Sequence, residues 1–242
     1  MTDPFKYQGD ELVLFQYAKN WKKYFSKQIA PYINGHVLEA GAGIGATTLL
    51  LNNGTPAKWL LLEPDKEMSA ILETMISAKK LAGNCKIQTG TIDQLTEKFD
   101  SILYIDVLEH IESDREEINK AAALLNDGGH LIVLSPAFQF LYNPFDKAIG
   151  HYRRYNKKML RQLTPETLKL LNCKYYDSAG YFAALVNKLL LRQKYPTIKQ
   201  VLFWDRWIVP VSRITDKLLF NSFGKSIISV WKKEQLHKTP FI

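Results

Sequence analysis

A glycine-rich turn near the start of the chain has residue types suited to binding a cofactor. An apolar run at residues 36–40 leads directly into Gly41-Ala42-Gly43. Glycine permits a tight turn and lets a ligand approach the backbone, and the helix expected next offers free N–H groups. Glu63 ends the following apolar run, where a carboxylate can bind both hydroxyls of an adenosine ribose. This order of strand, turn, helix, strand and acid predicts a cofactor that contains a nucleoside.

Two classes of cofactor fit the turn. Gly41, Gly43 and Ala46 match the G-x-G-x-x-A pattern of dinucleotide-binding proteins, so a NAD(P)-dependent oxidoreductase is one interpretation. Glu39 lies two residues before the first glycine, where a carboxylate suits a ligand with a cationic amino-acid end better than a pyrophosphate. An ordinary polar strand end is the alternative explanation of this acid.

The elements around the turn indicate the fold class, because short apolar runs alternate with helical stretches. The runs lie at residues 36–40, 58–63, 85–89, 101–105 and 130–135, and the helical stretches at 11–32, 45–52, 65–82 and 113–126. This alternation predicts an α/β fold with a doubly wound, mostly parallel sheet covered on both faces. Ligands bind such sheets at the carboxyl ends of the strands.

The chain is expected to form a single domain over residues 1–242. Within it we distinguish an N-terminal helical segment (1–34), a cofactor-binding core (35–136), a substrate loop with a helical lid (137–224) and a last strand (225–233). In the third segment, Pro165 is expected to begin a helix and residues 175–178 are a candidate sixth strand. The amphipathic stretch 181–222 is expected to be a helical insertion into the sheet.

Composition excludes several classes of protein. Hydrophobic residues make up 46% and charged residues 23% of the 242 residues, as in ordinary globular domains. The two cysteines, Cys85 and Cys173, are too few for a disulfide framework or a multi-cysteine zinc site, and no metal is expected. The start lacks a signal-type pattern and no run of 18 apolar residues exists, so we expect a cytoplasmic protein without a membrane span.

Four motifs in order resemble class I S-adenosylmethionine-dependent methyltransferases of the small-molecule branch, type 11/12-like. They are Glu39-x-Gly41-x-Gly43-x-Gly45, Leu61-Leu62-Glu63-Pro64-Asp65, the segment YIDVLEHI at 104–111 and LNDGGHL at 125–131. The resemblance implies S-adenosylmethionine as the cofactor. It implies a cofactor-binding set of Glu39, Gly41, Ala42, Gly43, Glu63, Pro64, Met68, Thr91, Ile92, Asp106 and Val107.

The resemblance also implies which part of the cofactor each of these residues contacts. The glycine turn packs against the methionine part, and Glu39 orients its ammonium. Glu63 holds the ribose, while Asp106 and Val107 border the sulfonium. Met68 either covers the adenine or is a core methionine. The family often has Gly-Asp after its third strand; this chain has Gly90-Thr91, which leaves Thr91 and Ile92 to line the adenine.

Two histidines are candidates for removing a proton from an acceptor hydroxyl, because histidine titrates near neutral pH. His110 follows the fourth strand, where it is either a base or a residue bonding the backbone at a helix start. His151 lies in Gly150-His151-Tyr152-Arg153-Arg154-Tyr155, which resembles the active-site flap of a bacterial subgroup often associated with cell-envelope sugar or lipid assembly. Tyr152, Arg153 and Arg154 are either a grip for an anionic substrate or a surface group paired with carboxylates such as Asp146.

Charge divides the chain unevenly. Residues 1–150 contain 14 lysines and arginines against 19 acids, whereas 151–242 contain 18 against 5. The basic half indicates either a solvated surface or an anionic partner. A nucleic acid is disfavoured, because the Asn/Asp-Pro-Pro-aromatic motif of base methylation is absent after the fourth strand. We expect an anionic small-molecule or lipid-linked acceptor, with 181–222 as a peripheral membrane contact, a lid or a dimer face. No feature indicates the oligomeric state.

Overall fold

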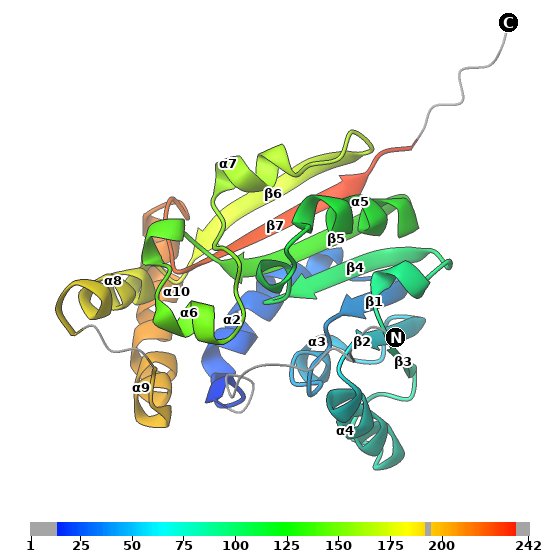
Figure 1. The fold of residues 1–242 in the computed structure, drawn as a ribbon, viewed down its shortest axis with the longest axis horizontal. Helices are drawn as coiled ribbons and strands as arrows, with labels where there is room; N and C mark the ends of the chain where they lie inside the picture. The colour runs from blue at the N-terminus through cyan, green and yellow to red at the C-terminus, as the bar shows by residue number, and fades with distance from the viewer. Residues whose placement is uncertain (1–13, 192–194, 236–242) are drawn as a thin grey trace, which may run out of the picture.

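The computed structural model describes residues 14–191 and 195–235 and places a seven-stranded sheet at its centre (Figure 1). The strands are β1 (His36–Ala40), β2 (Lys58–Glu63), β3 (Cys85–Thr89), β4 (Phe99–Ile105), β5 (Leu125–Pro136), β6 (Leu168–Tyr176) and β7 (Ser226–Lys233). Their order is β3-β2-β1-β4-β5-β7-β6. β7 runs antiparallel to β5 and β6, and the other paired strands are parallel. The predicted α/β class with a mostly parallel sheet is confirmed.

Helices cover both faces of the sheet, and alternate strand residues point to each face. On one face α5 (Asp114–Leu124) and α7 (Lys157–Gln162) pack against Leu38 and Ile102 and their neighbours. On the other face α2 (Lys19–Ile29), α4 (Lys66–Ser77) and α10 (Val209–Leu218) pack against residues such as Val37 and Leu103. The fully buried strand residues therefore form two apolar layers with the sheet between them.

The predicted helical insertion lies between β6 and β7. It consists of α8 (Ser178–Val186), a π-helical turn at Asn187–Leu191, α9 (Ile198–Phe203), a second π-helical turn at Trp204–Ile208, and α10. In Figure 1 these helices lie beyond the carboxyl ends of β4 and β5, so they stand over the ligand-binding edge of the sheet. The segment predicted as loop and lid, 137–224, also contains β6.

Two buried carboxylates attach the insertion to the N-terminal helix. Asp205 accepts the backbone N–H of Trp21 at 2.8 Å and that of Asn20 at 3.0 Å, which satisfies the free donors at the start of α2. Asp216 accepts the hydroxyl of Tyr24 at 3.0 Å. Because these bonds join residues more than 180 positions apart, α2 and the insertion form one wall.

Three sequence expectations differ from the structure. Pro165 does not begin a helix; it lies in a turn that leads into β6, whose residues pair with β7. The expected substrate loop, which begins at residue 137, contains α6 (Pro144–Ala148), which Asn143 and Asp146 cap reciprocally. The helix expected over 11–32 is interrupted at residues 16–18, so that α2 covers Lys19–Ile29; residues 11–13 lie outside the described residues.

Among the described residues, no helix is both long and apolar enough to cross a bilayer.

Candidate active site

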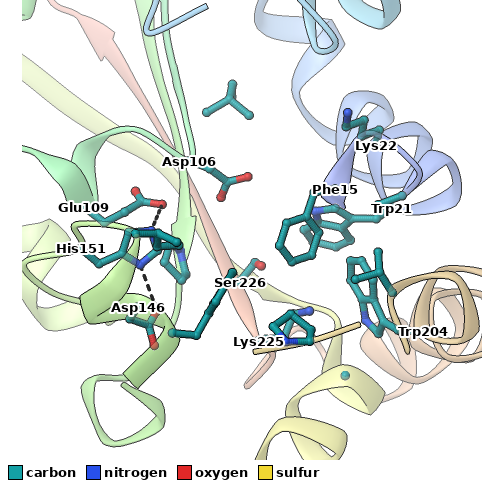
Figure 2. Close-up of a pocket in the computed structure, with 18 of the residues that line it drawn as sticks. Phe15, Trp21, Lys22, Asp106, Glu109, Asp146, His151, Trp204, Lys225 and Ser226 are labelled. Carbon is teal, nitrogen blue, oxygen red and sulfur yellow. Dashed lines mark hydrogen bonds and ion pairs between the residues drawn. The ribbon is translucent and has the colours of Figure 1, made fainter. Parts of the chain in front are cut away.

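A cavity of about 840 Å³ opens at the carboxyl edge of the sheet, between the glycine turn and the inserted helices. This volume lies within the range of small-molecule and cofactor sites. In Figure 2, Asp106, Glu109, His151 and Asp146 line one side, and Phe15, Trp21 and Trp204 line the other. The cavity thus has a titratable wall and an aromatic wall.

The glycine turn forms the floor of the cavity next to β1. Gly41, Ala42 and Gly43 all line it, as the sequence predicts. Gly41 has a φ of +66°, and a Cβ on it would lie 2.6 Å from a methyl carbon of Val107. Only glycine therefore permits this turn to pack against the loop that follows β4.

Glu63 joins the second strand to the glycine turn. One carboxylate oxygen accepts the backbone N–H of Gly43 at 2.7 Å, and the other accepts that of Asp65 at 2.9 Å. Burial raises the pKa of Glu63, while these two bonds lower it. The carboxylate lines the cavity with both oxygens oriented by the backbone, which suits it to receive a pair of ribose hydroxyls.

Glu39 lies behind the turn, not on the cavity surface. Its Oε2 accepts the hydroxyl of Thr48 and the indole N–H of Trp59, each at 2.8 Å. Burial raises the pKa of Glu39 to about 7. The residues that line the cavity do not include Glu39, whose bonds to Thr48 and Trp59 support the turn from beneath.

The predicted adenine contacts separate into two groups. Pro64 and Met68, at the end of β2 and the start of α4, line the cavity. Thr91 and Ile92 do not: the side chain of Thr91 is exposed near Asp93, and Ile92 is buried in the sheet core. The 3₁₀ turn at Ile92–Gln94 directs Ile92 into the core and away from the cavity.

Asp106 and Val107 directly follow β4 and line the cavity. Asp106 has a φ of +55°, in the left-handed region that most side chains avoid. Loss of hydration disfavours the charged carboxylate and raises the pKa of Asp106 to about 6, whereas the nearby His151 and Lys225 lower it. Backbone strain at a cavity-facing acid is common at functional sites.

The two candidate histidines lie together beside a buried acid. The rings of His110 and His151 are edge to face with centroids 4.5 Å apart. Nε2 of His151 lies 3.9 Å from Oε1 of Glu109, an oxygen that has no hydrogen-bond partner although Glu109 is fully buried. Burial, followed by the nearby His151, lowers the pKa of His110 to about 3, so its imidazole is neutral at pH 7.

Asp146 fixes the orientation of His151. Its Oδ1 lies 2.9 Å from Nδ1 of His151, and the guanidinium of Arg154 binds both oxygens of the same carboxylate at 2.9 Å. The backbone N–H of Asn143 also bonds Asp146 at 2.9 Å. These contacts turn Nε2 of His151 toward Glu109 and the cavity.

The predicted anion grip is already engaged with carboxylates of the protein. Arg153 pairs with Asp114 at 2.7 Å and donates to the carbonyls of Ile111 and Glu112, and Arg154 is held by Asp146. Tyr152 is half exposed and, like Arg153, does not line the cavity. Both guanidinium groups are thus paired with nearby acids, and Arg154 also lines the cavity.

Several lining residues are not apparent from sequence motifs. Glu109 and Asp146 belong to segments that the sequence singles out, but their side chains meet His151 only in the fold. Lys225 lies 3.6 Å from Asp177 and stands 3.6 Å above the ring of Trp204. Lys22 and Lys199 add positive charge to the lining. Amphipathic periodicity predicts helices around Lys22 and Lys199 but does not show that they face a cavity, and Lys225 lies in the bend before β7.

Comparison with known proteins bears on the chemistry of this site. Residues 38–131 match the family model of a methyltransferase domain. The matched segment is therefore a methyltransferase domain. The matched range includes the glycine turn, Glu63 and the Asp106–Glu109 segment, so the cofactor of the site is S-adenosylmethionine. The nicotinamide alternative is therefore set aside.

Solved structures confirm the fold of this methyltransferase. An S-adenosylmethionine-dependent methyltransferase from Clostridium acetobutylicum superposes with a TM-score of 0.57 at 12% identity, covering 90% of this chain and 92% of the other. Coclaurine N-methyltransferase gives 0.59 at 14%, with 89% and 72% covered. The [4+2]-cyclase SpnF gives 0.60 at 14%, with 88% and 81% covered. Because one of these is a cyclase, the fold alone does not define the acceptor. No curated protein matches the chain.

Proposed function

We propose that this methyltransferase transfers the methyl group of S-adenosylmethionine to a hydroxyl of an apolar, lipid-like or lipid-linked acceptor at a membrane surface. One observation carries the proposal: a single cavity runs from the glycine turn and Glu63, past the Glu109–His110–His151 cluster, to the aromatic wall of α2 and the insertion. A cofactor and an apolar acceptor can therefore meet beside the cluster.

The cofactor occupies the glycine-turn end in this proposal. Gly41, Ala42 and Gly43 pack against its methionine part, Glu63 with Pro64 binds the ribose, and Met68 covers the adenine. Asp106 and Val107 border the sulfonium, on the side that faces the cluster. The enzyme then has to align donor and acceptor and exclude water, which accounts for most of the catalysis in a displacement of this kind.

The acceptor hydroxyl lies against the Glu109–His110–His151 cluster. A hydroxyl must lose its proton as its oxygen bonds to the methyl carbon and the carbon–sulfur bond breaks with its electron pair left on sulfur. An imidazole held beside carboxylates can accept that proton. His151 is better oriented than His110 for this step, because Asp146 holds its Nδ1 and leaves Nε2 toward the cavity.

The other end of the cavity is mainly apolar and carries positive charge. Phe15, Trp21, Trp204 and Ile208 line it together with Lys22 and Lys199. This lining suits an apolar body with an anionic group, such as a phosphate or carboxylate, better than a stacked nucleic-acid base. The segment 137–224 supplies both the flap with His151 and the helices that cover this end.

The outer face of the insertion supports contact with a membrane. Large apolar side chains are exposed between the start of α8 and the turn after α10. Those that do not line the cavity are Phe182, Leu189, Ile198, Leu202, Trp207, Val211, Ile214, Leu218, Leu219 and Phe220. Such a density of exposed apolar residues marks an interaction surface. We call this set the apolar face.

Charge favours an anionic lipid bilayer as the partner of the apolar face. Between residues 178 and 222 the acids are Asp205 and Asp216, and both are buried. The described basic residues Lys188, Lys199, Arg206, Arg213 and Lys217 are exposed. Exposed apolar side chains among exposed basic residues, without exposed acids, are typical of helices that lie on anionic membranes.

The acceptor class is tested with methyl-labelled S-adenosylmethionine and a bacterial extract separated into lipid, small aqueous-soluble and nucleic-acid fractions. We expect label in the lipid fraction, identified by a 14-dalton mass shift of the product, and none with His151→Ala. Transfer confined to the nucleic-acid or aqueous fraction would contradict the proposal.

Membrane contact is tested by cosedimentation with vesicles of phosphatidylglycerol and, separately, of phosphatidylcholine. We expect binding to the anionic vesicles that weakens with salt and is lost in Ile214→Glu/Leu218→Glu. Leu171→Glu, at an exposed apolar position of β6, is the matched control and should still bind. Equal binding of both variants to the anionic vesicles would exclude the apolar face as the membrane-binding surface.

A further inference from the structure

We propose that Glu109, His110 and His151 form a binding site for one divalent transition-metal ion, at the acceptor end of the cavity. The sequence led to the expectation of no metal, and the inference arises from the side chains that the fold brings together. It rests on the proposed methyl transfer to a hydroxyl for its chemical role, but the binding itself does not depend on that transfer.

The first observation is the convergence of three donor atoms. One ligand atom from each of Glu109, His110 and His151 lies within 4.8 Å of the other two. Nε2 of His151 and Oε1 of Glu109 are 3.9 Å apart, too far for a hydrogen bond. Ligands bonded to zinc at about 2.0–2.2 Å lie roughly 3–3.5 Å from each other, so a small inward movement would complete the coordination.

The second observation is an oxygen without a partner. Oε1 of Glu109 has no hydrogen bond and the residue is fully buried. A buried carboxylate oxygen that lacks a partner is costly, because it has lost water without any compensation. A cation between Glu109 and the two imidazoles would supply that compensation. The orphaned oxygen points to the same place as the histidine nitrogens.

The third observation is that each donor is already held from behind. Asp146 bonds Nδ1 of His151, the carbonyl of Ile149 accepts from the ring of His110, and Ser135 donates to Oε2 of Glu109 at 2.9 Å. Metal-binding histidines almost always donate their second nitrogen to a carboxylate or a backbone carbonyl. The arrangement leaves one atom of each side chain directed toward the centre of the cluster.

The donor set defines the class of ion. Two imidazole nitrogens and one carboxylate oxygen suit zinc, iron(II), manganese(II) or cobalt(II), and suit calcium or magnesium less well. All three residues line the cavity, so further coordination positions would face the acceptor. Three protein ligands with an open position are typical of catalytic sites.

The ion would change how the acceptor loses its proton. A hydroxyl bound to a divalent ion is more acidic, so its proton passes to solvent and its oxygen stays bound until it attacks the methyl carbon. Nε2 of His151 would then bind the metal with its lone pair, so His151 would act as a ligand and not as the base. Asp146 and Arg154 are positioning residues that keep this imidazole in place.

The test is titration of the chelator-stripped full chain with Co²⁺, without cofactor or acceptor, followed by visible absorption. We expect one ion per chain, with binding lost in Glu109→Gln and in His151→Ala. His36→Ala, which removes a histidine outside the cavity, should bind as the unmodified protein does. Asp146→Asn should weaken binding by about 10–100-fold and shift the absorption band.

Calorimetric binding of S-adenosylmethionine to every variant shows that the fold is intact. No Co²⁺ binding by a stripped chain that still binds S-adenosylmethionine would overturn the site, as would undiminished binding by Glu109→Gln. If the stripped chain also methylates its acceptor at the full rate, the metal inference fails and the proposed function stands. If Co²⁺ binds as expected but no lipid is methylated, the proposed function fails alone.

Discussion

Oδ1 of Asp146 lies 2.9 Å from Nδ1 of His151, and this contact turns the other ring nitrogen toward Glu109 and the cavity. The same carboxylate is gripped by Arg154, so the imidazole is oriented by a chain of buried contacts. The acceptor end of the site therefore depends on residues that do not reach the cofactor.

Replacement of His151 tests the acceptor end. His151→Ala should lower methyl-transfer turnover by about 10²–10⁴-fold, because the acceptor proton is then no longer removed at the cluster. Its affinity for S-adenosylmethionine should be unchanged in calorimetry, because the ring lies on the acceptor side. His130→Ala, at a histidine that does not line the cavity, is the control. Near-full turnover in His151→Ala would contradict the assignment.

The two arginines should differ in their effect on stability. Arg154→Ala leaves the buried carboxylate of Asp146 without its bidentate partner and should destabilise the fold by about 3–5 kcal/mol in urea titrations. Arg153→Ala breaks a more accessible pair with Asp114 and should cost roughly 0–1 kcal/mol.

Arg153→Ala should also leave the Michaelis constant for the acceptor unchanged at low and high salt. Both results follow from pairing within the protein. A raised Michaelis constant of Arg153→Ala at low salt would indicate that Arg153 binds the anionic acceptor.

Glu39 should make the stability of the fold depend on pH. Its carboxyl has a pKa of about 7 in the fold because of burial, above the ordinary value of 4.5 that applies to the unfolded chain. Between these values the folded state holds a proton that the unfolded state has lost, so stability falls as pH rises from about 4.5 to 7. The full decrease amounts to about 3 kcal/mol.

Glu39→Gln keeps an oxygen for Thr48 and Trp59 but does not titrate. Thermal or urea unfolding of this variant should show less decrease over the same pH range, and greater stability than the unmodified protein at pH 8. Parallel pH profiles for the two proteins would show that burial of Glu39 carries no such penalty.

Sequence reasoning succeeded where function depends on local backbone. The glycine turn and Glu63 lie next to one another because β1 and β2 are paired in register, and both strands are evident as apolar runs. Thr91 and Ile92, expected at the adenine, do not line the cavity, because a short 3₁₀ turn directs Ile92 into the core. Residue spacing does not encode that turn.

Contacts between distant residues account for the other differences. Glu109 and His151 are 42 positions apart, and only the return of the flap across the end of β4 brings them together. The pairing of Arg153 with Asp114 likewise joins separate elements. The sequence alone therefore could not decide whether Arg153 is free to bind a substrate or is paired within the protein. The strand β6 was missed over most of its length because Pro165 was taken as a helix start, whereas Leu168 and Leu170 begin a pairing with β7.

Glu63 carries the most specific prediction about the cofactor. Glu63→Ala should weaken S-adenosylmethionine binding by about 1.5–3 kcal/mol, the range for hydrogen bonds to a charged group. Glu67→Ala, at an exposed acid in the first turn of α4, is the matched control and should bind normally. Unchanged affinity in a folded Glu63→Ala protein would show that the ribose does not bind at Glu63.

Calorimetric titration of the full chain with S-adenosylmethionine and, in parallel, with NAD⁺ tests the central claim most directly. The account predicts saturable binding of one S-adenosylmethionine per chain, weakened in Glu63→Ala, and no binding of NAD⁺. Saturable binding of NAD⁺ by a chain that does not bind S-adenosylmethionine would contradict it.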